Sequence, residues 1–201
     1  MTRWLLAFAF LFALPSFSQE LGPDQLVQKV TEEVLATIKS DRQLAAGDKQ
    51  KALKLAEEKV LPHIDFEEAT RLAVGRDWQQ ATPEQRKRLV EEFRRMLVRT
   101  YSNAIEGYDG QTLKVLPARG KQTDEDTTVR TQFIRSGGKP LPIDFQMHKK
   151  DGGWKIFDIN VEGISLVLTY RTEFDGIVKQ DGIDGLIRRL GEKNAPARIA
   201  L

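Results

Sequence analysis

The sequence has 201 residues, of which 40% are hydrophobic and 30% charged, as is typical of an ordered globular protein. The formal net charge is only +2, whereas nucleic-acid-binding proteins concentrate basic residues on one surface, so we expect no nucleic-acid partner. Cysteine is absent, which excludes a disulfide, a thiolate metal site and a thiol nucleophile.

The first 18 residues have the layout of a secretory signal peptide. Arg3 supplies a positive charge, residues 4–14 form an apolar run, and Ser16 and Ser18 stand at the small-residue positions before a cleavage site. The run is too short to cross a bilayer at about 1.5 Å of rise per residue. We predict export and cleavage before Gln19. Residues 19–193 are then expected to form a single domain, in which residues 19–75 could be a helical subdomain, and residues 194–201 a flexible tail.

The N-terminal half is predicted to be helical. Apolar residues at three- and four-residue spacing predict helices over residues 23–40 and 48–60, the second of which ends at Pro62. Asp65 with Glu68 has the pattern of a capping box and predicts a further helix start.

A long helix is predicted from Thr82 to Glu106. Thr82-Pro83-Glu84-Gln85 places a cap, a proline and a glutamine where a helix N-terminus prefers them. The helix also carries a basic flank of Arg88, Arg95 and Arg99. We interpret this flank as a solvated face with a few helix ion pairs, and the alternative is a docking surface for an acidic partner.

After Gly110 the hydrophobic period changes to two, which predicts strands. Four strands are expected over residues 111–117, 127–135, 140–149 and 153–161, with hairpin turns at Gly137-Gly138 and Gly152-Gly153. Helices followed by a meander predict an α+β fold, in which a four-stranded antiparallel sheet packs against several helices. We expect the long helix and a helix over residues 164–179 to cover the sheet, and a final helix over residues 182–193.

Motifs for enzymatic chemistry are mostly missing. The segment around Ser165 lacks the second glycine of a nucleophile elbow, which argues against a serine hydrolase. His63 and His148 have no metal-ligand spacing, and His148 falls on the polar side of its predicted strand, where exposure to solvent is expected.

One carboxylate site stays open as an enzymatic option. Asp158 or Glu162, placed inside an apolar concave sheet, would have a raised pKa and could act as a general base. The structural alternative, which we favour, is a carboxylate that pairs with Arg171 or Arg130, or one that lies at the rim of a pocket.

Several motifs resemble those of one protein family. Residues 158–174 read Asp-Ile-Asn-Val-Glu-Gly-Ile-Ser-Leu-Val-Leu-Thr-Tyr-Arg-Thr-Glu-Phe, similar to the signature Asp-Val-x-Val-Glu-Gly-Val-Ser-Leu-Val-x-x-Tyr-Arg-x-x-Phe of the MlaC family, also called toluene-tolerance auxiliary proteins. Residues 70–75, 81–85 and 151–155 match further family motifs, so the resemblance covers nearly the whole mature chain in order. The differences, such as isoleucine for valine at 159 and 164, keep the character of the side chains.

The resemblance implies a periplasmic phospholipid carrier without enzymatic activity. Such a carrier shuttles lipid across the Gram-negative periplasm between an outer-membrane lipoprotein–porin complex and an inner-membrane ABC transporter bearing an MCE-domain ring, which maintains the lipid asymmetry of the outer membrane. The implied fold is a curved antiparallel sheet, NTF2/cystatin-like in outline, that encloses acyl chains against helices and leaves the headgroup outside. We expect a monomer with no cofactor besides the bound lipid cargo.

Physical estimates agree with such a carrier. An acyl chain of about 15 methylenes loses about 12 kcal/mol on moving from a bilayer into water, at about 0.8 kcal/mol per methylene. An empty cavity of about 500 Å³ would cost about 12 kcal/mol at about 24 cal/mol per Å³. We therefore expect the cavity to be filled with lipid and the empty form to collapse in part.

The expected lipid-binding residues were chosen from the apolar face of each predicted strand and the apolar side of each predicted helix. Those on the sheet are Val115, Val129, Phe133, Ile143, Phe145, Met147, Trp154 and Ile156, and those on helices are Phe93, Leu97, Tyr101, Val167 and Tyr170. Trp154 and Tyr170 suit the mouth, since each has an apolar body and a polar tip. For each residue, ordinary core packing is as good an explanation as lipid contact.

Two other functions stay open: an NTF2-like enzyme acting on a hydrophobic small molecule, and a periplasmic chaperone or adaptor for apolar segments.

The joint between the last strand and the helix after it is expected to set the width of the cavity. Glu162-Gly163 is the predicted bend, because the hydrophobic period changes there from two to three or four. We therefore predict that Gly163→Val impairs lipid binding more than Ser165→Ala.

Overall fold

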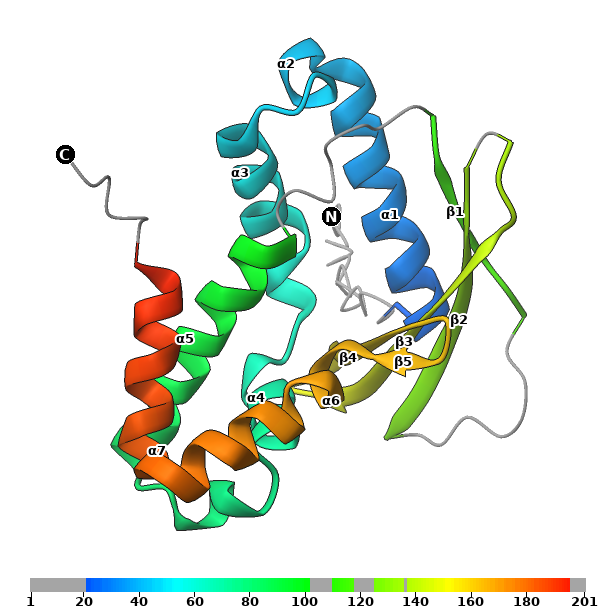
Figure 1. The fold of residues 1–201 in the computed structure, drawn as a ribbon. Helices are drawn as coiled ribbons and strands as arrows, with labels where there is room; N and C mark the ends of the chain where they lie inside the picture. Colours follow the sequence, from blue (N-terminus) through cyan, green and yellow to red (C-terminus); the bar gives the residue numbers. More distant parts are fainter. Residues whose placement is uncertain (1–20, 102–109, 118–124, 136, 196–201) are drawn as a thin grey trace, which may run out of the picture.

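The computed structural model describes residues 21–101, 110–117, 125–135 and 137–195. The helices and short 3-10 turns (η) are α1 Pro23–Ser40, α2 Arg42–Ala45, α3 Lys49–Lys59, η1 Leu61–His63, α4 Phe66–Val74, η2 Gly75–Gln80, α5 Pro83–Tyr101, α6 Leu166–Thr169 and α7 Arg171–Asn194. The strands are β1 Thr112–Val115, β2 Asp126–Ile134, β3 Leu141–Lys150, β4 Gly153–Val161 and β5 Ile164–Ser165. Helices thus precede and follow an antiparallel sheet, which confirms the predicted α+β class (Figure 1).

Local sequence signals explain several helix starts. At α5, Thr82 Oγ1 accepts a hydrogen bond from Gln85 N at 3.2 Å, and Thr82 N donates to Gln85 Oε1 at 3.0 Å, so the predicted capping box is complete. At α4 only half of the predicted box forms. Asp65 Oδ1 accepts from Glu68 N, but the Glu68 carboxylate pairs with Arg71 instead of returning to Asp65. The predicted end of α5 at Glu106 lies outside the described residues.

The sheet is a meander of five strands in the order β1-β2-β3-β4-β5, one more than predicted. The additional strand, β5, arises because Glu162 and Gly163 both have positive φ, 53° and 83°, which fits a two-residue hairpin turn. The chain therefore folds back onto β4 for two residues before α6 begins. A strand this short has no hydrophobic period of its own, so the pattern after Gly163 predicted a helix directly.

A bulge in β4 changes which of its residues share a face. Met147 lies opposite Ile156, whereas its neighbour Gln146 lies opposite Asp158, so Phe157 is an additional residue in the strand. Beyond the bulge, Ile159 lies opposite Phe145. The strict alternation expected over residues 154–161 therefore holds only up to Ile156.

The helix that covers the sheet is α1, and not α5 as expected. Leu26 and Val27 of α1 pack with the buried Val129 and Met147 of β2 and β3. Figure 1 shows α1 lying along the sheet, while α5 and α7 run side by side at a distance from it. An apolar stripe predicts that one side of a helix is buried, but it does not specify the partner.

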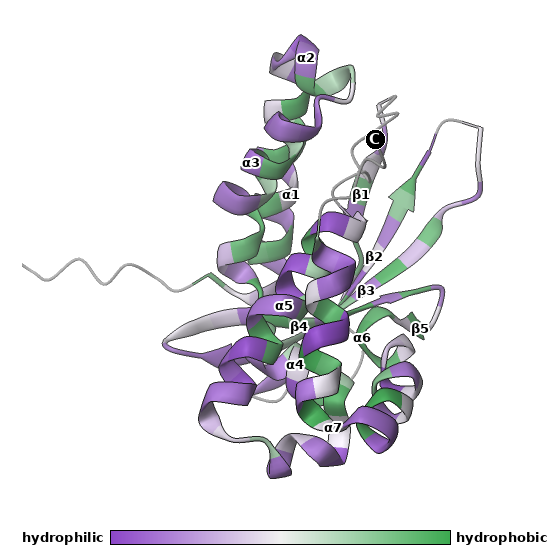
Figure 2. Ribbon diagram, turned by 60° about the vertical axis from the view of Figure 1, so that its left-hand side comes forward, coloured by the Kyte–Doolittle hydropathy of each residue, from purple (hydrophilic) through white to green (hydrophobic). Residues whose placement is uncertain are grey.

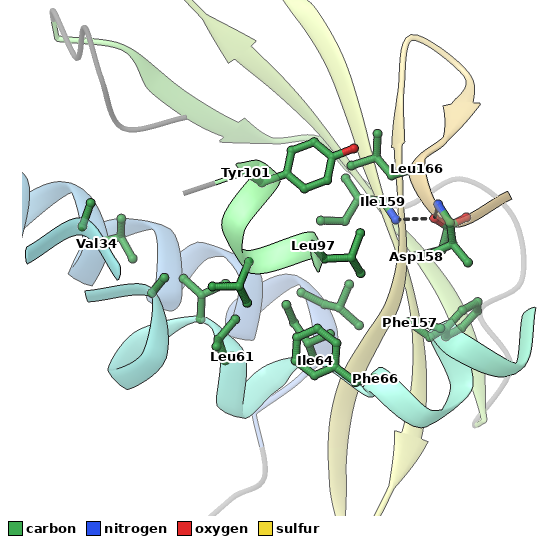
Figure 3. Close-up of a pocket in the computed structure, with 17 residues that line it drawn as sticks. Val34, Leu61, Ile64, Phe66, Leu97, Tyr101, Phe157, Asp158, Ile159 and Leu166 are labelled. Carbon is green, nitrogen blue, oxygen red and sulfur yellow. Dashed lines mark hydrogen bonds between the residues drawn. The ribbon is translucent and has the colours of Figure 1, made fainter. Parts of the chain in front are cut away.

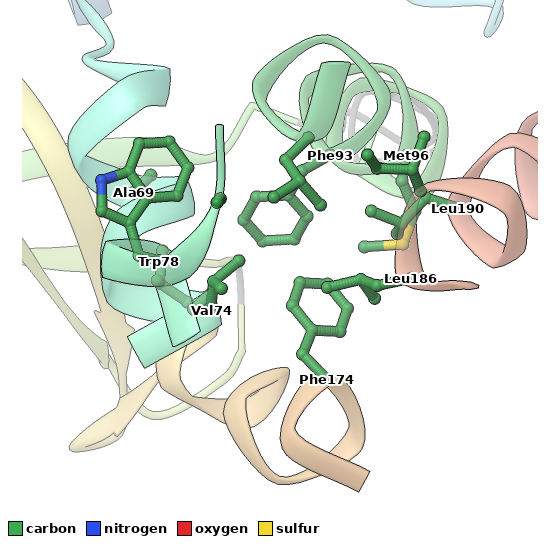
Figure 4. Packing of buried hydrophobic residues seen from close by; sticks show 13 residues of the cluster. Ala69, Val74, Trp78, Phe93, Met96, Phe174, Leu186 and Leu190 are labelled. Atoms are coloured by element: carbon green, nitrogen blue, oxygen red, sulfur yellow. The ribbon is translucent and has the colours of Figure 1, made fainter. Parts of the chain in front are cut away.

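The largest core lies among helices. Phe93 of α5 is fully buried and makes edge-to-face contacts with Tyr170 and with Phe174 of α7, each with a ring-centroid distance of 5.3 Å. Leu186 and Leu190 of α7 close this core, as Figure 4 shows. A smaller core joins α1, α2 and α3. In Figure 2 these helices mix hydrophilic and hydrophobic residues, as expected of helices that bury one side.

The helix predicted over residues 164–179 begins instead as β5 and α6, and its remainder from Arg171 joins the helix predicted over 182–193 in one longer element with a kink. α7 runs from Arg171 to Asn194, and Gly182 within it has φ 70° and ψ −178°, a backbone conformation that only glycine adopts without strain. The predicted tail begins where α7 ends, and residues 196–201 lie outside the described residues. In the part of the chain that the structure describes, no helix is long and apolar enough to cross a membrane.

Two glycines of α7 are expected to respond in opposite directions to alanine. Gly185 is buried, and an ideal Cβ there would lie 2.2 Å from Cβ of Asp181, so Gly185→Ala should lower the free energy of unfolding by about 2 kcal/mol. Gly176 has open space around it, so Gly176→Ala should raise that free energy by about 0.5 to 1 kcal/mol through helix propensity. Urea unfolding of both variants measures the difference, and equal values would contradict the packing at Gly185.

Candidate functional site

An apolar cavity of about 360 Å³ lies beside β4, between that strand and the helices. Its wall is formed by Val34, Ala52, Ala56, Val60, Leu61, Ile64, Phe66, Ala69, Leu97, Val98, Tyr101, Ile156, Phe157, Asp158, Ile159, Leu166 and Val167. These residues come from α1, α3, η1 and the residues beside it, α4, α5, β4 and α6. Figure 3 shows Leu97 and Tyr101 of α5 on the side facing Ile159 and Leu166.

The position of the cavity follows from β4. Four consecutive residues of this strand, 156–159, line the wall, so the cavity runs along the strand instead of lying over one face of the sheet. The other side is lined by short side chains, Ala52 and Ala56 of α3 and Ala69 of α4. Alanines on facing helices leave room that leucines would fill, and this is how the sequence keeps the space open.

Among the described residues of the wall, only Asp158 is charged, and both oxygens of its carboxylate accept hydrogen bonds. Its Oδ2 accepts from Ser165 Oγ at 2.5 Å, and its Oδ1 accepts from Ile159 N at 2.8 Å and from Val167 N at 3.1 Å. The side chain is buried and holds the start of α6 against β4. The partners are therefore neither Arg171 nor Arg130, but the role is the structural one that we favoured over a general base.

Ser165 is more important to this joint than the sequence indicated. Its hydroxyl donates to Asp158 and accepts from Leu168 N at 2.9 Å, which makes it the N-cap of α6. We expect Ser165→Ala to lower the free energy of unfolding by about 2 kcal/mol, since it removes a cap and a donor to a buried carboxylate. Ser40, whose hydroxyl bonds only to Thr37 O at an exposed helix end, is the control, and Ser40→Ala should change this free energy by less than about 0.5 kcal/mol. Chemical denaturation that gave equal values for the two variants would contradict this account.

Gly163 is required at the joint because of its backbone conformation. At φ 83° any side chain is strained, although the space around the residue is open. We predicted that Gly163→Val impairs lipid binding more than Ser165→Ala. The structure shows that the first variant would strain the turn and the second would remove the N-cap of α6, so both are expected to destabilise the joint.

A second polar cluster ties the other side of the cavity to the sheet. Asp65 N donates to Ile156 O at 2.8 Å, which places the neighbouring Ile64 and Phe66 in the wall. The Asp65 side chain is 4% exposed, and its Oδ2 lies 2.8 Å from Lys150 Nζ and 3.0 Å from His148 Nε2. His148 was expected to face solvent, but it packs instead between Asp65 and the ring of Phe157, whose centroid lies 5.2 Å from its own.

The charge of Asp65 is stabilised by its neighbours. Burial by itself raises the pKa of this carboxyl group, but the hydrogen bonds from Lys150 and Glu68 N and the charge of Lys150 outweigh it, so the pKa is lower than usual. The same pair raises the pKa of Lys150. Asp65 and Lys150 therefore form an ion pair that connects the start of α4 to β3.

Tyr101 and Tyr170 link the mouth of the cavity to the helical core. Tyr101 is 41% exposed while lining the cavity, whereas Tyr170 is half-buried against Phe93. Burial raises the pKa of Tyr170 to about 12, with a smaller contribution from its hydrogen bond with Tyr101. The Tyr170 phenol is therefore not ionised near neutral pH.

The structure brings four of the expected lipid-binding residues together in this cavity: Leu97, Tyr101, Ile156 and Val167. Val115, Val129, Phe145, Met147 and Trp154 pack instead in the core beneath α1, and Phe93 and Tyr170 in the helical core. Phe133 and Ile143 are half-buried on the sheet and do not line the cavity.

The residues that sequence reasoning missed belong mainly to α3 and to the segment from Val60 to Ala69. The available signal was the pairing of Ala52 and Ala56 at helical spacing in a helix rich in charged residues. Among the described residues, no group of three or more His, Cys, Asp or Glu side chains could hold a metal ion.

Known proteins resemble this chain in sequence along most of its length. The family model for MlaC protein matches residues 28–192. The intermembrane phospholipid transport system binding protein MlaC of Haemophilus influenzae is 22% identical over 85% of this chain and 81% of its own length. The toluene tolerance protein ttg2D of Pseudomonas putida is 25% identical over 90% of this chain and 84% of its own length.

A solved structure extends the similarity to the fold. The phospholipid-binding protein of Ralstonia solanacearum, determined in complex with a phospholipid, is 36% identical and superimposes with a TM-score of 0.79 over 87% of this chain and 97% of that one. Since the family model spans most of the chain and the fold agrees, this chain belongs to the MlaC family.

Proposed function

We propose that this protein binds a phospholipid by its acyl chains in the cavity beside β4 and carries it across the periplasm. The observation that carries the proposal is the chemistry of the described wall residues. They are apolar apart from Tyr101 and from Asp158, whose carboxylate is occupied by protein donors. Such a wall favours a ligand of methylene groups over a polar one, because every buried polar ligand atom would lack a partner.

Energies support a lipid-filled cavity. Left empty, about 360 Å³ would cost up to about 9 kcal/mol at about 24 cal/mol per Å³, and less where the cavity opens to solvent. That upper limit is close to the whole stability of a typical domain. An acyl chain that fills the space removes this cost and is itself shielded from water at about 0.8 kcal/mol per methylene. Ligand and protein therefore stabilise each other.

The cellular role that we propose is intermembrane lipid transport. It is supported by the description of the Haemophilus relative as part of an intermembrane phospholipid transport system and by the predicted signal peptide over residues 1–18. In this role the carrier would exchange lipid with an outer-membrane lipoprotein–porin complex and an inner-membrane ABC transporter bearing an MCE-domain ring, and so maintain outer-membrane asymmetry. The function needs no cofactor and no catalytic step.

Native mass spectrometry with lipid extraction tests the proposal. Protein purified from the periplasm of an expressing bacterium is expected to carry stoichiometric phospholipid and to begin at Gln19. A bound peptide would favour a chaperone, and turnover of a small hydrophobic molecule would favour an enzyme. Protein without ligand whose cavity retains its full volume would contradict the proposal.

A further inference from the structure

A groove lined by basic residues adjoins the apolar cavity. It has a volume of about 510 Å³ and lies between α3, α5 and the end of α7. Leu61 and Val98 line both hollows, so the two share one wall. The described residues of the groove include the basic Lys49, Arg94, Arg95 and Arg99, against one carboxylate, that of Glu57.

Arg94 is the cation of this groove that is best placed for a ligand. Arg95 pairs with Glu91 and Glu92, and Arg99 donates to the carbonyl oxygens of residues 193–195 at the end of α7. Arg94, by contrast, has no carboxylate partner among the described residues. Its guanidinium lies 5.7 Å from the ring centroid of Phe66, and Phe66 itself lines the apolar cavity. Arg94 thus lies at the boundary between the basic groove and the apolar cavity.

The cavity itself offers nothing to an acidic headgroup. Among the lining residues that the structure describes, the one charged residue, Asp158, would repel a phosphate, and none is a cation. A phosphate attached to chains in the cavity must therefore lie outside it, and the neighbouring basic groove is where Coulomb attraction favours it. An arginine guanidinium offers paired N–H donors that match phosphate oxygens.

We infer that the groove between α3 and α5 binds the phosphate of the lipid whose chains fill the cavity, with Arg94 as its main ligand and Lys49 as a second cation. The inference rests on the proposed function and deepens it, since it gives the carrier a preference for lipids with an anionic phosphate over neutral diacylglycerols.

The test compares three ligands with shared parts: phosphatidylglycerol, a diacylglycerol with the same acyl chains, and glycerol phosphate without chains. Wild-type protein is expected to bind phosphatidylglycerol more tightly than diacylglycerol in a fluorescent-lipid displacement assay. Arg94→Gln should weaken phosphatidylglycerol binding about tenfold, the loss expected for one charge-assisted hydrogen bond, and leave diacylglycerol binding unchanged. Arg88→Gln removes an exposed arginine that does not line the groove on the same helix and should alter neither.

Each other outcome contradicts a particular step. An equal loss for both lipids in Arg94→Gln would mean that Arg94 only supports Phe66, and no loss would mean that the phosphate lies elsewhere. Competition by glycerol phosphate alone at low concentration would show that the groove takes free phosphates, which overturns the link to the cavity. If wild-type protein bound neither lipid, the proposed function itself would be wrong.

Discussion

Replacing Ala56 by tryptophan is expected to abolish phospholipid binding while the protein stays folded. Ala56 lines the cavity from α3, opposite the side formed by α5 and β4. An indole ring there occupies the space of the acyl chains and adds apolar contacts to a wall that is already apolar. The variant should therefore contain no lipid after purification, and its free energy of unfolding should equal or exceed that of the delipidated wild type.

The control is Ala45→Trp, which places the same side chain on an exposed position of α2. This variant should retain lipid at the wild-type ratio. Lipid extraction and native mass spectrometry measure both variants side by side. Full lipid occupancy in Ala56→Trp, with a native circular dichroism spectrum, would show that the chains do not lie beside α3.

Replacing Asp65 by alanine is expected to lower the free energy of unfolding by about 3 kcal/mol. The variant loses the N-cap of α4, worth about 1 kcal/mol, and the charge-assisted hydrogen bonds with Lys150 and His148, worth about 2 kcal/mol. It should also weaken lipid binding, because Asp65 holds Ile64 and Phe66 in the cavity wall. Asp175→Ala, which breaks only the exposed pair with Lys179, should cost less than about 1 kcal/mol.

The contribution of Asp65 should depend on pH in one direction. Its pKa is lowered in the folded protein, so its charge stabilises the fold above the pKa of the unfolded chain, about 3.9. This stabilisation is lost as the pH falls through the lower folded-state pKa. The difference between wild type and Asp65→Ala should therefore shrink as the pH falls below about 4. A difference that grew as the pH fell below about 4 would contradict the assignment.

The sequence was sufficient where local signals decide the structure. The cap at Thr82 and the alternation in residues 141–147 each depend on nearby residues, and α5 begins and β3 runs at the predicted positions in the chain. The family was also identified correctly from residues 158–174, because that motif contains the whole joint. It includes the turn glycine, the serine cap and the carboxylate that binds the cap.

The location of the cavity depended on features with no local signal. Strand phase assigned Val129 and Met147 to a lipid site, but a residue that faces inward can meet either ligand or helix, and here it meets α1. Because of the bulge at Phe157, the residues of β4 that line the cavity do not follow the expected alternation of faces. The opposite wall is built from alanines of a highly charged helix, whose short side chains gave no hydrophobic stripe of the usual strength.

A phosphatidylethanolamine with a photoactivatable diazirine in one acyl chain tests the central claim most directly. After loading, irradiation and proteolysis, mass spectrometry identifies the residues that the chain touches. We predict cross-links within residues 52–69, 97–101 and 156–167, all in the wall of the cavity beside β4. Cross-links confined to the interface of α1 with β2 and β3, around Leu26 and Val129, would contradict this location of the lipid site.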